Sequence, residues 1–433
     1  MSRITRAGKQ QHSLLDNSDL KMALTPQQID IIKATVPVVQ EYGTAITTTF
    51  YKNVLAANPA LNNIFNQTNQ KNGDQPRALS GALAAYAANI DNLAVLSDAV
   101  ERICQKHASL FIRPEHYPIV GKYLLEAMGQ VLGAALTPEI LDAWTAAYNQ
   151  LAQIMIDREI QLYQEAGEWK EWRDFKIAKK VKESSIITSF YLEPVDGKLL
   201  PPFKPGQYIS VQVHVPDFGY LQSRQYSLSD RPNEKYYRIS VKREDAVVLP
   251  EANTPVEAGV ISNILHDTKH EGDVVQVSPP QGEFFLDLQK NTDSPVVLIS
   301  AGVGLTPMVS ILNTLVERGS ARPISYIHAA RSKEVDAFHD HVQEIATSNS
   351  NVRSWVFVKN LPADNYGHPV KDLAGRMDLS KVKDAALHLD DSTTVYFICG
   401  PGGFMDDMSK VLQTFGVSED RINLEVFGTG EAQ

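Results

Sequence analysis

The apolar residues of this chain follow three different spacings in succession, and this limits the fold more than any other feature. From Leu24 to about Gly167 they recur every three or four residues, as on one face of a helix. Between Trp172 and about Leu288 they form short β-branched runs separated by Pro and Gly. From Pro295 onward, strand-like apolar runs alternate with helical segments. The sequence therefore predicts a multi-domain protein: an all-α domain, then an antiparallel β-barrel, then an α/β domain with a doubly wound parallel sheet.

The changes of spacing also predict where the domains begin and end. The expected segments are an N-terminal extension without ordered structure at 1–21, the helical domain at 22–167, the β-barrel at 170–289 and the α/β domain at 290–433. Thr25 followed by Pro26 is typical of a helix N-terminus, so folded structure is expected to start near Met22. The first 21 residues are basic and rich in hydroxyl groups but lack a secretory apolar core, which leaves a transit peptide as the alternative.

Charge and cysteine content exclude several classes of protein. The chain has 41 basic and 51 acidic residues, a net charge of −10, so no basic field favours nucleic acid or anionic lipid. No apolar run reaches the roughly 18 to 20 residues that span a bilayer, which argues against an integral membrane protein. Two cysteines, Cys104 and Cys399, cannot build a disulfide framework or a thiolate metal site. We expect a reducing compartment, the cytoplasm, with the mitochondrial matrix as the alternative.

The helical segment contains few candidates for metal chemistry. Its two histidines are His107, in the middle of a helix, and His116, at the start of the next, and either could equally be an ordinary packed side chain. Tyr51 and Gln75 lie on apolar helices, where they could point into a pocket or remain at its rim. Glu159 lies on the apolar stripe of the last helix, where a buried carboxylate needs a partner and a solvent-facing one does not.

The runs NPALNNIF, NQKNGDQPRALSGAL, QKHASL and EHYPIVGKYLL together resemble the globin domain of flavohaemoglobins. This resemblance implies that His107 is the proximal ligand of a haem b, held without covalent attachment because no CxxCH is present. It also implies that Tyr51 and Gln75 hydrogen-bond bound dioxygen, while Glu159 and Tyr117 hold the proximal histidine. The other haem contacts that it implies are Phe65, Leu79 and Lys106.

The barrel segment carries PGQY at 205–208, then RQYSL at 224–228, then GVISNILH. In this order the runs resemble the flavin domain of ferredoxin reductase-like enzymes. The resemblance implies that Arg224 pairs with the FAD pyrophosphate, while Tyr226 and Ser227 contact the isoalloxazine ring. The further FAD contacts are Tyr208, Gln225, Ser262 and Asn263, the last two at a helix start that favours a phosphate. A plain helix cap is the alternative for Ser262. The segment 245–257 is expected to be a longer loop than is usual in this family.

The α/β segment carries glycine-rich turns directly after two expected strands. AGVGLTP follows VVLIS, where a backbone must approach a phosphate, and CGPGGFM closes a later strand. The C-terminal LEVFGTG resembles the family ending in which an aromatic residue covers the flavin, with threonine in place of the usual proline. The expected contacts are Gly302, Val303, Gly304, Leu305, Thr306, Pro307, Cys399, Gly400, Pro401, Val426, Phe427, Gly428 and Thr429. Cys399 could equally be a buried small residue without a chemical role.

The resemblance implies a nitric oxide dioxygenase that detoxifies nitric oxide in a nitrosative stress response. One FAD would take a hydride from NADH or NADPH and pass single electrons to one haem b, where dioxygen and nitric oxide give nitrate. Alternatives are a flavin, ferric or peroxide reductase with haem as relay, and an oxygen-storage or gas-sensing protein. No output domain supports the sensor, and an electron-donating Glu159 and Tyr117 pair disfavours storage. The sequence leaves the nucleotide preference and the oligomeric state open, a monomer included.

Overall fold

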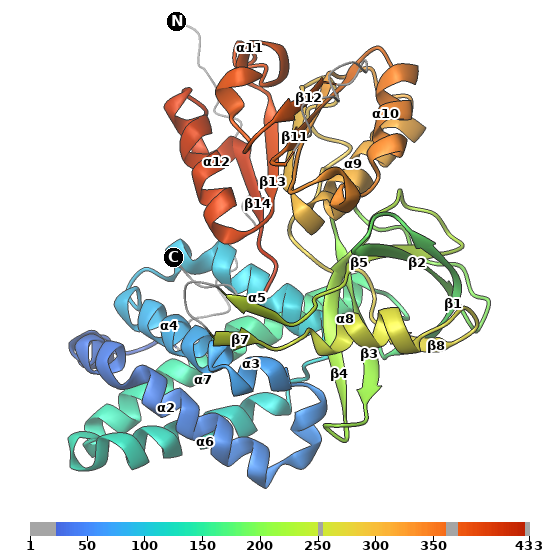
Figure 1. The fold of residues 1–433 in the computed structure, drawn as a ribbon. Coiled ribbons are helices and arrows are strands. Elements are labelled where there is room, and N and C mark those ends of the chain that lie inside the picture. The colour runs from blue at the N-terminus through green and yellow to red at the C-terminus, as the bar shows by residue number, and fades with distance from the viewer. Residues whose placement is uncertain (1–22, 250–253, 361–370, 429–433) are drawn as a thin grey trace, which may run out of the picture. The chain divides into compact units, whose positions relative to one another are not determined.

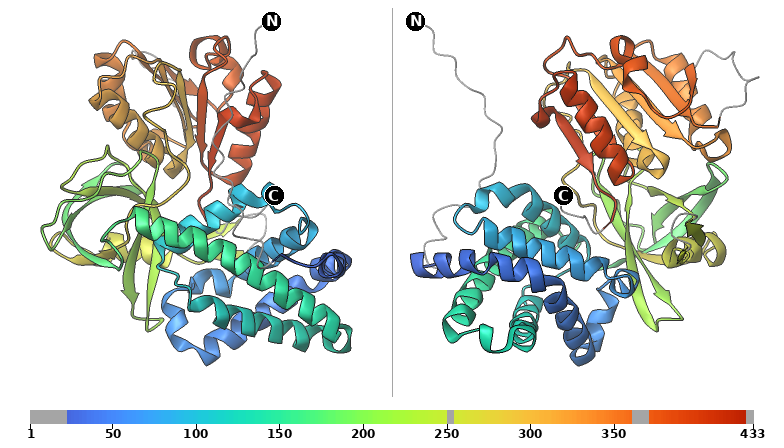
Figure 2. Two further views of the ribbon diagram at one scale, coloured as in Figure 1. Left: turned by 180° about the vertical axis from the view of Figure 1, so that it is seen from behind. Right: turned by 60° about the vertical axis from the view of Figure 1, so that its left-hand side comes forward.

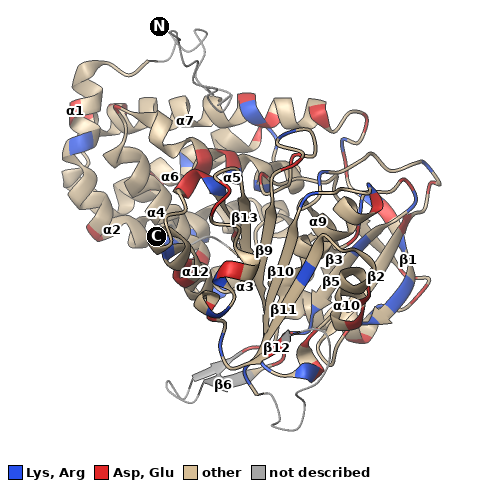
Figure 3. Ribbon diagram, turned by 90° about the horizontal axis from the view of Figure 1, so that it is seen from above, with Lys and Arg blue, Asp and Glu red and all other residues tan. Residues whose placement is uncertain are grey.

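The computed structural model describes residues 23–249, 254–360 and 371–428. The expectation for the N-terminal extension and the role of Thr429 therefore lie outside the described residues. The chain divides into two compact units, of which the first ends at Lys170 and the second runs from Glu171 to Gly428. Within the described ranges, no helix combines the length and hydropathy required to cross a membrane. Acidic and basic residues are interspersed along the elements of both units (Figure 3).

The first unit is entirely helical, as predicted (Figure 1). Its α-helices are α1 (Pro26–Ala34), α2 (Val36–Ala57), α3 (Gln67–Lys71), α4 (Asp74–Ala88), α5 (Ser97–Ser109), α6 (His116–Leu132) and α7 (Pro138–Glu165). Short 3-10 turns are η2 (Pro59–Asn63), η3 (Leu93–Leu96) and η4 (Gly133–Ala135).

Local sequence explains where these helices begin and end. Thr25 caps α1 by accepting from the Gln28 backbone N–H, while the Gln28 side chain accepts from the Thr25 N–H. Gly73 has a φ of 78°, which lets the chain turn sharply into α4. The core of the unit lies where α2 packs on α4 and α6, and includes Phe50 and Leu83.

The second unit begins with a six-stranded antiparallel barrel. Its strands are β1 (Arg173–Lys182), β2 (Ile187–Pro194), β3 (Tyr208–Val215), β4 (Tyr220–Ser227), β5 (Tyr237–Lys242) and β8 (Val274–Val277), in the order β4-β3-β8-β1-β2-β5. An antiparallel bridge between Leu228 and Ile239 joins the two outer strands, which closes the sheet. The lysine-rich β1 is the strand that the sequence showed least clearly, although its Phe175 and Ile177 are fully buried.

Two expectations for this region are corrected. Segment 245–257 was expected to be a loop, but it contains an antiparallel pair, β6 (Val247–Leu249) and β7 (Thr254–Val256). Ser262 and Asn263 were expected to open a helix, but they end the one-turn α8 (Val260–Asn263). A π-helical turn, η5 (Ile264–Thr268), follows directly. The Gly turn at Gly259, rather than a Ser cap, begins α8.

The remainder of the second unit is an α/β domain with a fully parallel sheet. Its strands are β9 (Val296–Ala301), β10 (Ile324–Ala330), β11 (Val352–Val358), β12 (Lys371–Ala374), β13 (Val395–Cys399) and β14 (Ile422–Glu425), in the order β12-β11-β10-β9-β13-β14. The α-helices are α9 (Leu305–Glu317), α10 (His339–Ser348), α11 (Lys383–Ala386) and α12 (Gly402–Thr414). The 3-10 turns are η6 (Gly302–Gly304), η7 (Lys333–Val335), η8 (Leu379–Lys381) and η9 (Glu419–Arg421).

Helices cover both faces of this sheet, as the doubly wound prediction requires (Figure 2). The helices α9 and α10 bury one face, and α11 and α12 bury the other (Figure 1). The strand order reverses between β9 and β13, so their carboxyl ends form the crevice in which such sheets bind ligands. The three predicted classes of domain are therefore confirmed.

A buried polar cluster joins the barrel to the α/β domain. Asp230 follows β4 and accepts a hydrogen bond from the Asn313 amide at 2.9 Å, while its carbonyl accepts from Ser310 at 2.8 Å. Burial acts to raise the pKa of Asp230, but the nearby Arg238 guanidinium and several hydrogen bonds outweigh it and hold the pKa below its usual value. The carboxylate is therefore charged at neutral pH and ties α9 to the barrel.

Candidate functional site

Two polar side chains from different helices meet in the apolar core of the helical unit. Tyr51 on α2 is only 6% exposed, and its ring packs edge-on against Phe65 with ring centroids 5.4 Å apart. The Gln75 amide, in the first turn of α4, hydrogen-bonds the Tyr51 hydroxyl. Burial raises the pKa of Tyr51 well above its usual value, so its hydroxyl remains a protonated donor. The amide oxygen of Gln75 is buried and has no hydrogen-bond partner within the described residues.

A second polar cluster surrounds His107 on α5. Nδ1 of His107 lies 2.8 Å from Oε1 of Glu159 and 3.2 Å from the Tyr117 hydroxyl, and that hydroxyl donates to the same Glu159 oxygen at 2.6 Å. Glu159 is 2% exposed, so it is not the solvent-facing carboxylate that the sequence left open. Because a carboxylate only accepts hydrogen bonds, Nδ1 carries the hydrogen and Nε2 keeps its lone pair. Nε2 makes no hydrogen bond to the described protein, and the His107 side chain is 31% exposed.

The surroundings of Tyr117 fix its position. The Tyr148 hydroxyl on α7 donates to the Tyr117 carbonyl at 2.6 Å. Close packing of α6 on α7 requires Gly121, because a Cβ there would lie 2.4 Å from the Tyr148 ring. Burial, together with the nearby Glu159 charge, raises the pKa of Tyr117 well above its usual value, so its hydroxyl keeps the proton that it donates.

The other histidine of the helical unit is already engaged. Nδ1 of His116 accepts from the backbone N–H of Arg113 at 3.0 Å, which fixes the entry into α6. Burial lowers the pKa of His116, so the ring is neutral at neutral pH. His107 and His116 were both open as ligands from spacing alone, and their bonding now separates them. Of the other haem contacts expected, Phe65 and Leu79 are partly buried against the helical core, and Lys106 is half-buried beside His107.

The polar atoms of this unit fit a haem held by one imidazole. A carboxylate orients His107 and leaves its Nε2 available as a ligand. In the core packed around α2 and α4, a buried phenol and an amide with an unpaired oxygen are the polar groups that a ligand could meet. The second Glu159 oxygen is also buried and without a hydrogen-bond partner among the described residues.

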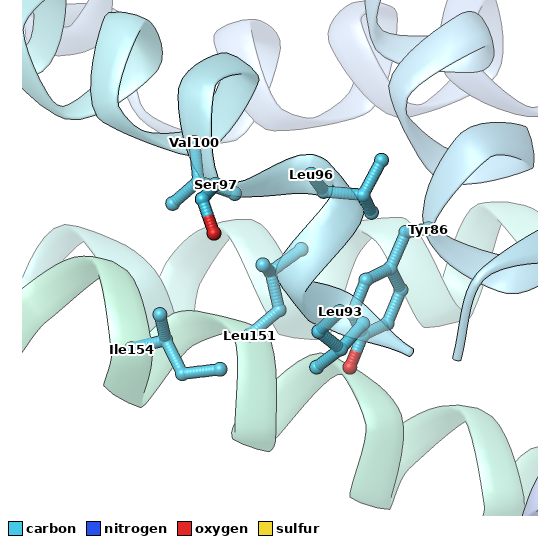
Figure 4. A pocket seen from close by; sticks show the side chains of 7 residues that line it. All are labelled: Tyr86, Leu93, Leu96, Ser97, Val100, Leu151 and Ile154. Carbon is cyan, nitrogen blue, oxygen red and sulfur yellow. The ribbon is translucent and has the colours of Figure 1, made fainter. Parts of the chain in front are cut away.

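A small apolar pocket elsewhere in the helical unit is not this site (Figure 4). Its volume is about 20 Å³, enough for about one water molecule and far too small for a haem. The lining side chains, which Figure 4 shows converging from α4, α7 and the η3–α5 segment, are Tyr86, Leu93, Leu96, Ser97, Val100, Leu151 and Ile154. None of the residues expected to contact the haem lines it.

Pairing of β3 with β4 in the barrel places the two sequence motifs that are expected to bind flavin next to each other. Tyr208 on β3 pairs with Ser227 on β4, and Val211 pairs with Arg224, so PGQY and RQYS lie side by side. The Ser227 hydroxyl is buried without a hydrogen-bond partner in the described residues, which fits a polar ring edge of a ligand. Burial lowers the pKa of Arg224 and raises that of Tyr226, whose phenol therefore stays neutral.

Gln225, Ser262 and Asn263, the other residues expected to contact flavin, form hydrogen bonds within the protein. The Gln225 amide donates to the Ser210 hydroxyl at 3.1 Å. Ser262 donates to the Gly259 carbonyl at 3.0 Å but is not the helix cap that the sequence left as its alternative, because Gly259 occupies the cap position. Asn263 donates to the Gly259 carbonyl at 2.9 Å, but its amide oxygen is buried and unpaired within the described chain. Asn263 therefore keeps one acceptor that a ligand can use.

The glycine-rich turn after β9 forms one wall of a pocket of about 550 Å³. Gly302, Val303 and Pro401 line it, whereas the expected contacts Leu305, Thr306 and Pro307 are buried within the first turn of α9. Cys399 is fully buried, and burial raises the pKa of its thiol, so it is a small core residue here. Gly400 packs beside it, where a Cβ would lie 2.7 Å from the Phe404 ring.

The C-terminal motif reaches the same edge of the sheet. Glu425 of β14 pairs in register with Cys399 of β13, and Phe427, two residues later, is 42% exposed. Val426 is half-buried and Gly428 is exposed. An exposed aromatic ring at this point is compatible with the expected flavin cover.

The sequence did not single out the basic residues that line the pocket beside the Gly302–Gly304 turn. These are Lys242, Arg331, Lys359 and Arg376. They come from four separate segments, so no local motif connects them. The available signal was their position, since Arg331 and Lys359 each directly follow a strand.

Comparison with known proteins identifies the family. A Globin family model matches residues 48–155, and an Oxidoreductase NAD-binding domain model matches residues 298–410. The chain is 48% identical to the Flavohemoprotein of Bordetella pertussis, over 94% of this chain and 99% of that protein. This chain belongs to the flavohemoprotein family. The Flavohemoprotein of Bacillus subtilis is 44% identical over 94% of this chain and 98% of its own length.

Solved structures agree with this family assignment. A crystal structure of a flavohemoglobin from Malassezia yamatoensis, with bound FAD and heme, has a TM-score of 0.80 and 30% identity, covering 94% of this chain and 100% of that one. The FAD/NAD binding domain of a nitric oxide dioxygenase from Vibrio cholerae has a TM-score of 0.51 and 36% identity, covering 59% of this chain and 98% of that one. The resemblance to flavohaemoglobins, and the order of domains that it implied, are confirmed.

Proposed function

We propose that this flavohemoprotein is an NAD(P)H-dependent nitric oxide dioxygenase that uses one haem b and one FAD. The proposal rests on two features of the helical unit. Tyr51 and Gln75 are buried and hydrogen-bonded to each other, and His107 is hydrogen-bonded by Glu159 and Tyr117. Membership of the flavohemoprotein family and the likeness to a nitric oxide dioxygenase reductase domain support it.

Each side chain of the helical unit has a role that follows from its surroundings. When bound, the haem supplies dioxygen binding and one-electron chemistry, and FAD converts the hydride of NAD(P)H into single electrons. His107 offers Nε2 as the axial ligand. Glu159 holds the Nδ1 proton and makes the imidazole more electron-donating, which favours oxygen activation over storage. Tyr51 donates its phenolic hydrogen to the substrate, and the apolar core around it excludes water.

The second unit binds the electron donors in the proposed enzyme. Arg224 neutralises the FAD pyrophosphate, and the unpaired Ser227 hydroxyl hydrogen-bonds the flavin ring. Tyr226 and Tyr208 provide the flanking aromatic surface. The Gly302–Gly304 turn receives the pyrophosphate of the nicotinamide nucleotide, since its backbone lies at the pocket wall.

Replacing Tyr51 with Phe should speed the dissociation of dioxygen from the ferrous protein. The variant keeps the ring packing against Phe65 but removes the hydrogen-bond donor. A hydrogen bond to a charged acceptor is worth about 1.5–3 kcal/mol, so the dissociation rate should rise about 10- to 100-fold. Stopped-flow displacement of dioxygen by carbon monoxide measures this rate. Unchanged dissociation kinetics would contradict a hydrogen bond from Tyr51 to dioxygen. Tyr86→Phe serves as the control, because it alters a tyrosine that is bonded to the Ala147 carbonyl.

Replacing Glu159 with Gln should leave the haem bound but make the imidazole less electron-donating. The amide oxygen still accepts from Nδ1–H, but the negative charge is lost. We expect a higher ferric/ferrous potential, a lower iron–histidine stretching frequency and turnover reduced about 10- to 100-fold. Resonance Raman spectroscopy and redox titration provide the measurements. Glu165→Gln, on the exposed part of the same helix, should change none of them.

The deciding experiment measures nitric oxide consumption by the purified holoprotein in air, with nitrate quantified against nucleotide oxidised. Rapid consumption with stoichiometric nitrate is expected. If the nucleotide reduces the haem but nitric oxide persists, the proposed dioxygenase activity is wrong. A haem-relayed reductase or an oxygen-storage protein then becomes the better interpretation.

A further inference from the structure

The pocket beside the Gly302–Gly304 turn has a positively charged end made by three neighbouring strands. Arg331 directly follows β10, Lys359 directly follows β11, and Arg376 comes just after β12. The Lys359 N–H donates to the Ala330 carbonyl at 3.0 Å, and the Gly375 N–H donates to the Val358 carbonyl at 3.0 Å. These backbone bonds hold the three strand ends next to one another, so the three cations share one edge of the pocket.

The positive charges of these three side chains are not neutralised by ion pairs in the described part of the chain. Within the described ranges, neither Arg331, Lys359 nor Arg376 forms an ion pair, and all three are exposed. The fourth basic residue of the lining, Lys242, is paired with Glu244 at 2.8 Å. The acidic member of the lining, Asp407, comes from α12, which follows β13 on the opposite side of β9. The β10–β12 end of the pocket is therefore suited to an anion.

The acids close to this edge each bond a neighbouring side chain. Oδ2 of Asp372 is paired with Lys333 at 3.0 Å, while its buried Oδ1 has no hydrogen-bond partner in the described residues, and Asp336 is paired with His339 at 2.7 Å. The Glu334 carboxylate hydrogen-bonds Ser332, which lowers its pKa. In a doubly wound nucleotide-binding sheet, an acidic residue near the end of the second strand binds the 2′-hydroxyl of NAD, whereas an arginine there accommodates the 2′-phosphate of NADP. In this chain, Arg331 occupies the position that directly follows β10.

We propose that Arg331 and Lys359 bind the 2′-phosphate of NADPH, with Arg376 completing the positive edge, so that this reductase accepts NADPH as well as or in preference to NADH. Two or more cations around one phosphate give short, charge-assisted hydrogen bonds, and arginine adds a bidentate geometry. The inference rests on the proposed function only in placing a nicotinamide nucleotide in this pocket. It does not depend on the reaction at the haem.

Calorimetric titration of the holoprotein with 2′,5′-ADP and with 5′-AMP tests the proposal, since the two probes differ by the 2′-phosphate. The wild-type protein should bind 2′,5′-ADP at least about tenfold more tightly. Arg331→Gln and Lys359→Gln should each weaken 2′,5′-ADP about tenfold and leave 5′-AMP within about twofold. Arg353→Gln removes the same charge near the opposite end of β11 and should change neither value.

Equal binding of the two probes by the wild-type protein would overturn the proposal. So would an equal loss of both probes in Arg331→Gln, because the cations would then serve only the shared 5′-phosphate. Ferricyanide reduction through FAD gives a kinetic readout that needs neither haem nor nitric oxide: the KM for NADPH should rise in Arg331→Gln while the KM for NADH stays constant. Normal ferricyanide reduction without nitric oxide consumption would contradict the dioxygenase and leave this inference standing.

Discussion

Replacing His107 with Ala should give a protein that contains FAD but almost no haem. A carboxylate binds Nδ1 of His107 and leaves its Nε2 lone pair available, whereas Nδ1 of His116 accepts from a backbone N–H and its Nε2 therefore carries the hydrogen. Loss of an outer-shell partner already reduces metal affinity about 10- to 100-fold, and loss of the ligand itself should exceed this. We expect haem content below about one tenth of the wild-type value, measured by the pyridine haemochrome assay on protein matched for FAD content.

Two measurements separate lost ligation from lost folding. His116→Ala removes the other histidine of the helical unit, whose Nδ1 is bonded to the Arg113 backbone, and it should retain haem. Added imidazole should restore part of the haem binding to His107→Ala by filling the vacated ligand position. A full complement of haem with an unchanged spectrum in His107→Ala would contradict the assignment and require another ligand.

Replacing Gly304 with Val should nearly abolish flavin reduction by the nicotinamide nucleotide. A Cβ at residue 304 would lie 2.3 Å from the Cys399 carbonyl oxygen and 2.8 Å from the Gly400 nitrogen. Both contacts are with backbone, so relief requires the turn after β9 and the end of β13 to separate. Misplacement of a binding group by about 1 Å can cost about 100-fold in rate. We expect a loss of this size in the rate of flavin reduction, measured by anaerobic stopped flow.

Gly402→Ala is the matched control for this change. Gly402 is the first residue of α12, shortly after β13, and a Cβ there would meet no heavy atom within 4 Å. Its flavin reduction should remain close to that of the wild type. FAD and haem content should also be unchanged in Gly304→Val, because the defect is confined to the nucleotide turn. A normal rate of flavin reduction in Gly304→Val would show that the turn after β9 does not need its close approach to the end of β13.

Much of the architecture could be predicted from local patterns. The helical spacing, the β-branched runs and the alternation of strands and helices gave the three domain classes in order, since each period reflects which side chains face a core. The predicted run 352–358 coincides with β11. The apolar spacing also placed Tyr51, Gln75 and His107 on helices, although His107 lies in the last turn of α5 and not in the middle of a helix as expected.

Local patterns predicted less where polar residues masked a buried strand face, or where an element was too short to show a regular spacing of apolar residues. The lysines of β1 masked its buried face, and the pair β6–β7 was read as a loop because proline and polar residues dominate that segment. Ser262 illustrates a different limit. Serine near a short helix favours either a phosphate contact or a backbone bond, and its bond to Gly259 becomes known only from the geometry of the turn.

The sequence alone determined the order of the domains and the chemical types available to each, because periodicity and turn residues act between near neighbours in the chain. Tertiary structure decided which of those residues meet. Spacing could not choose between His107 and His116, and the choice came from Glu159, which a different helix brings to within 2.8 Å of His107. The positive edge at Arg331 and Lys359 likewise exists only because parallel pairing places successive strand ends side by side. Contacts of this kind depend on packing between distant segments, which no local pattern records.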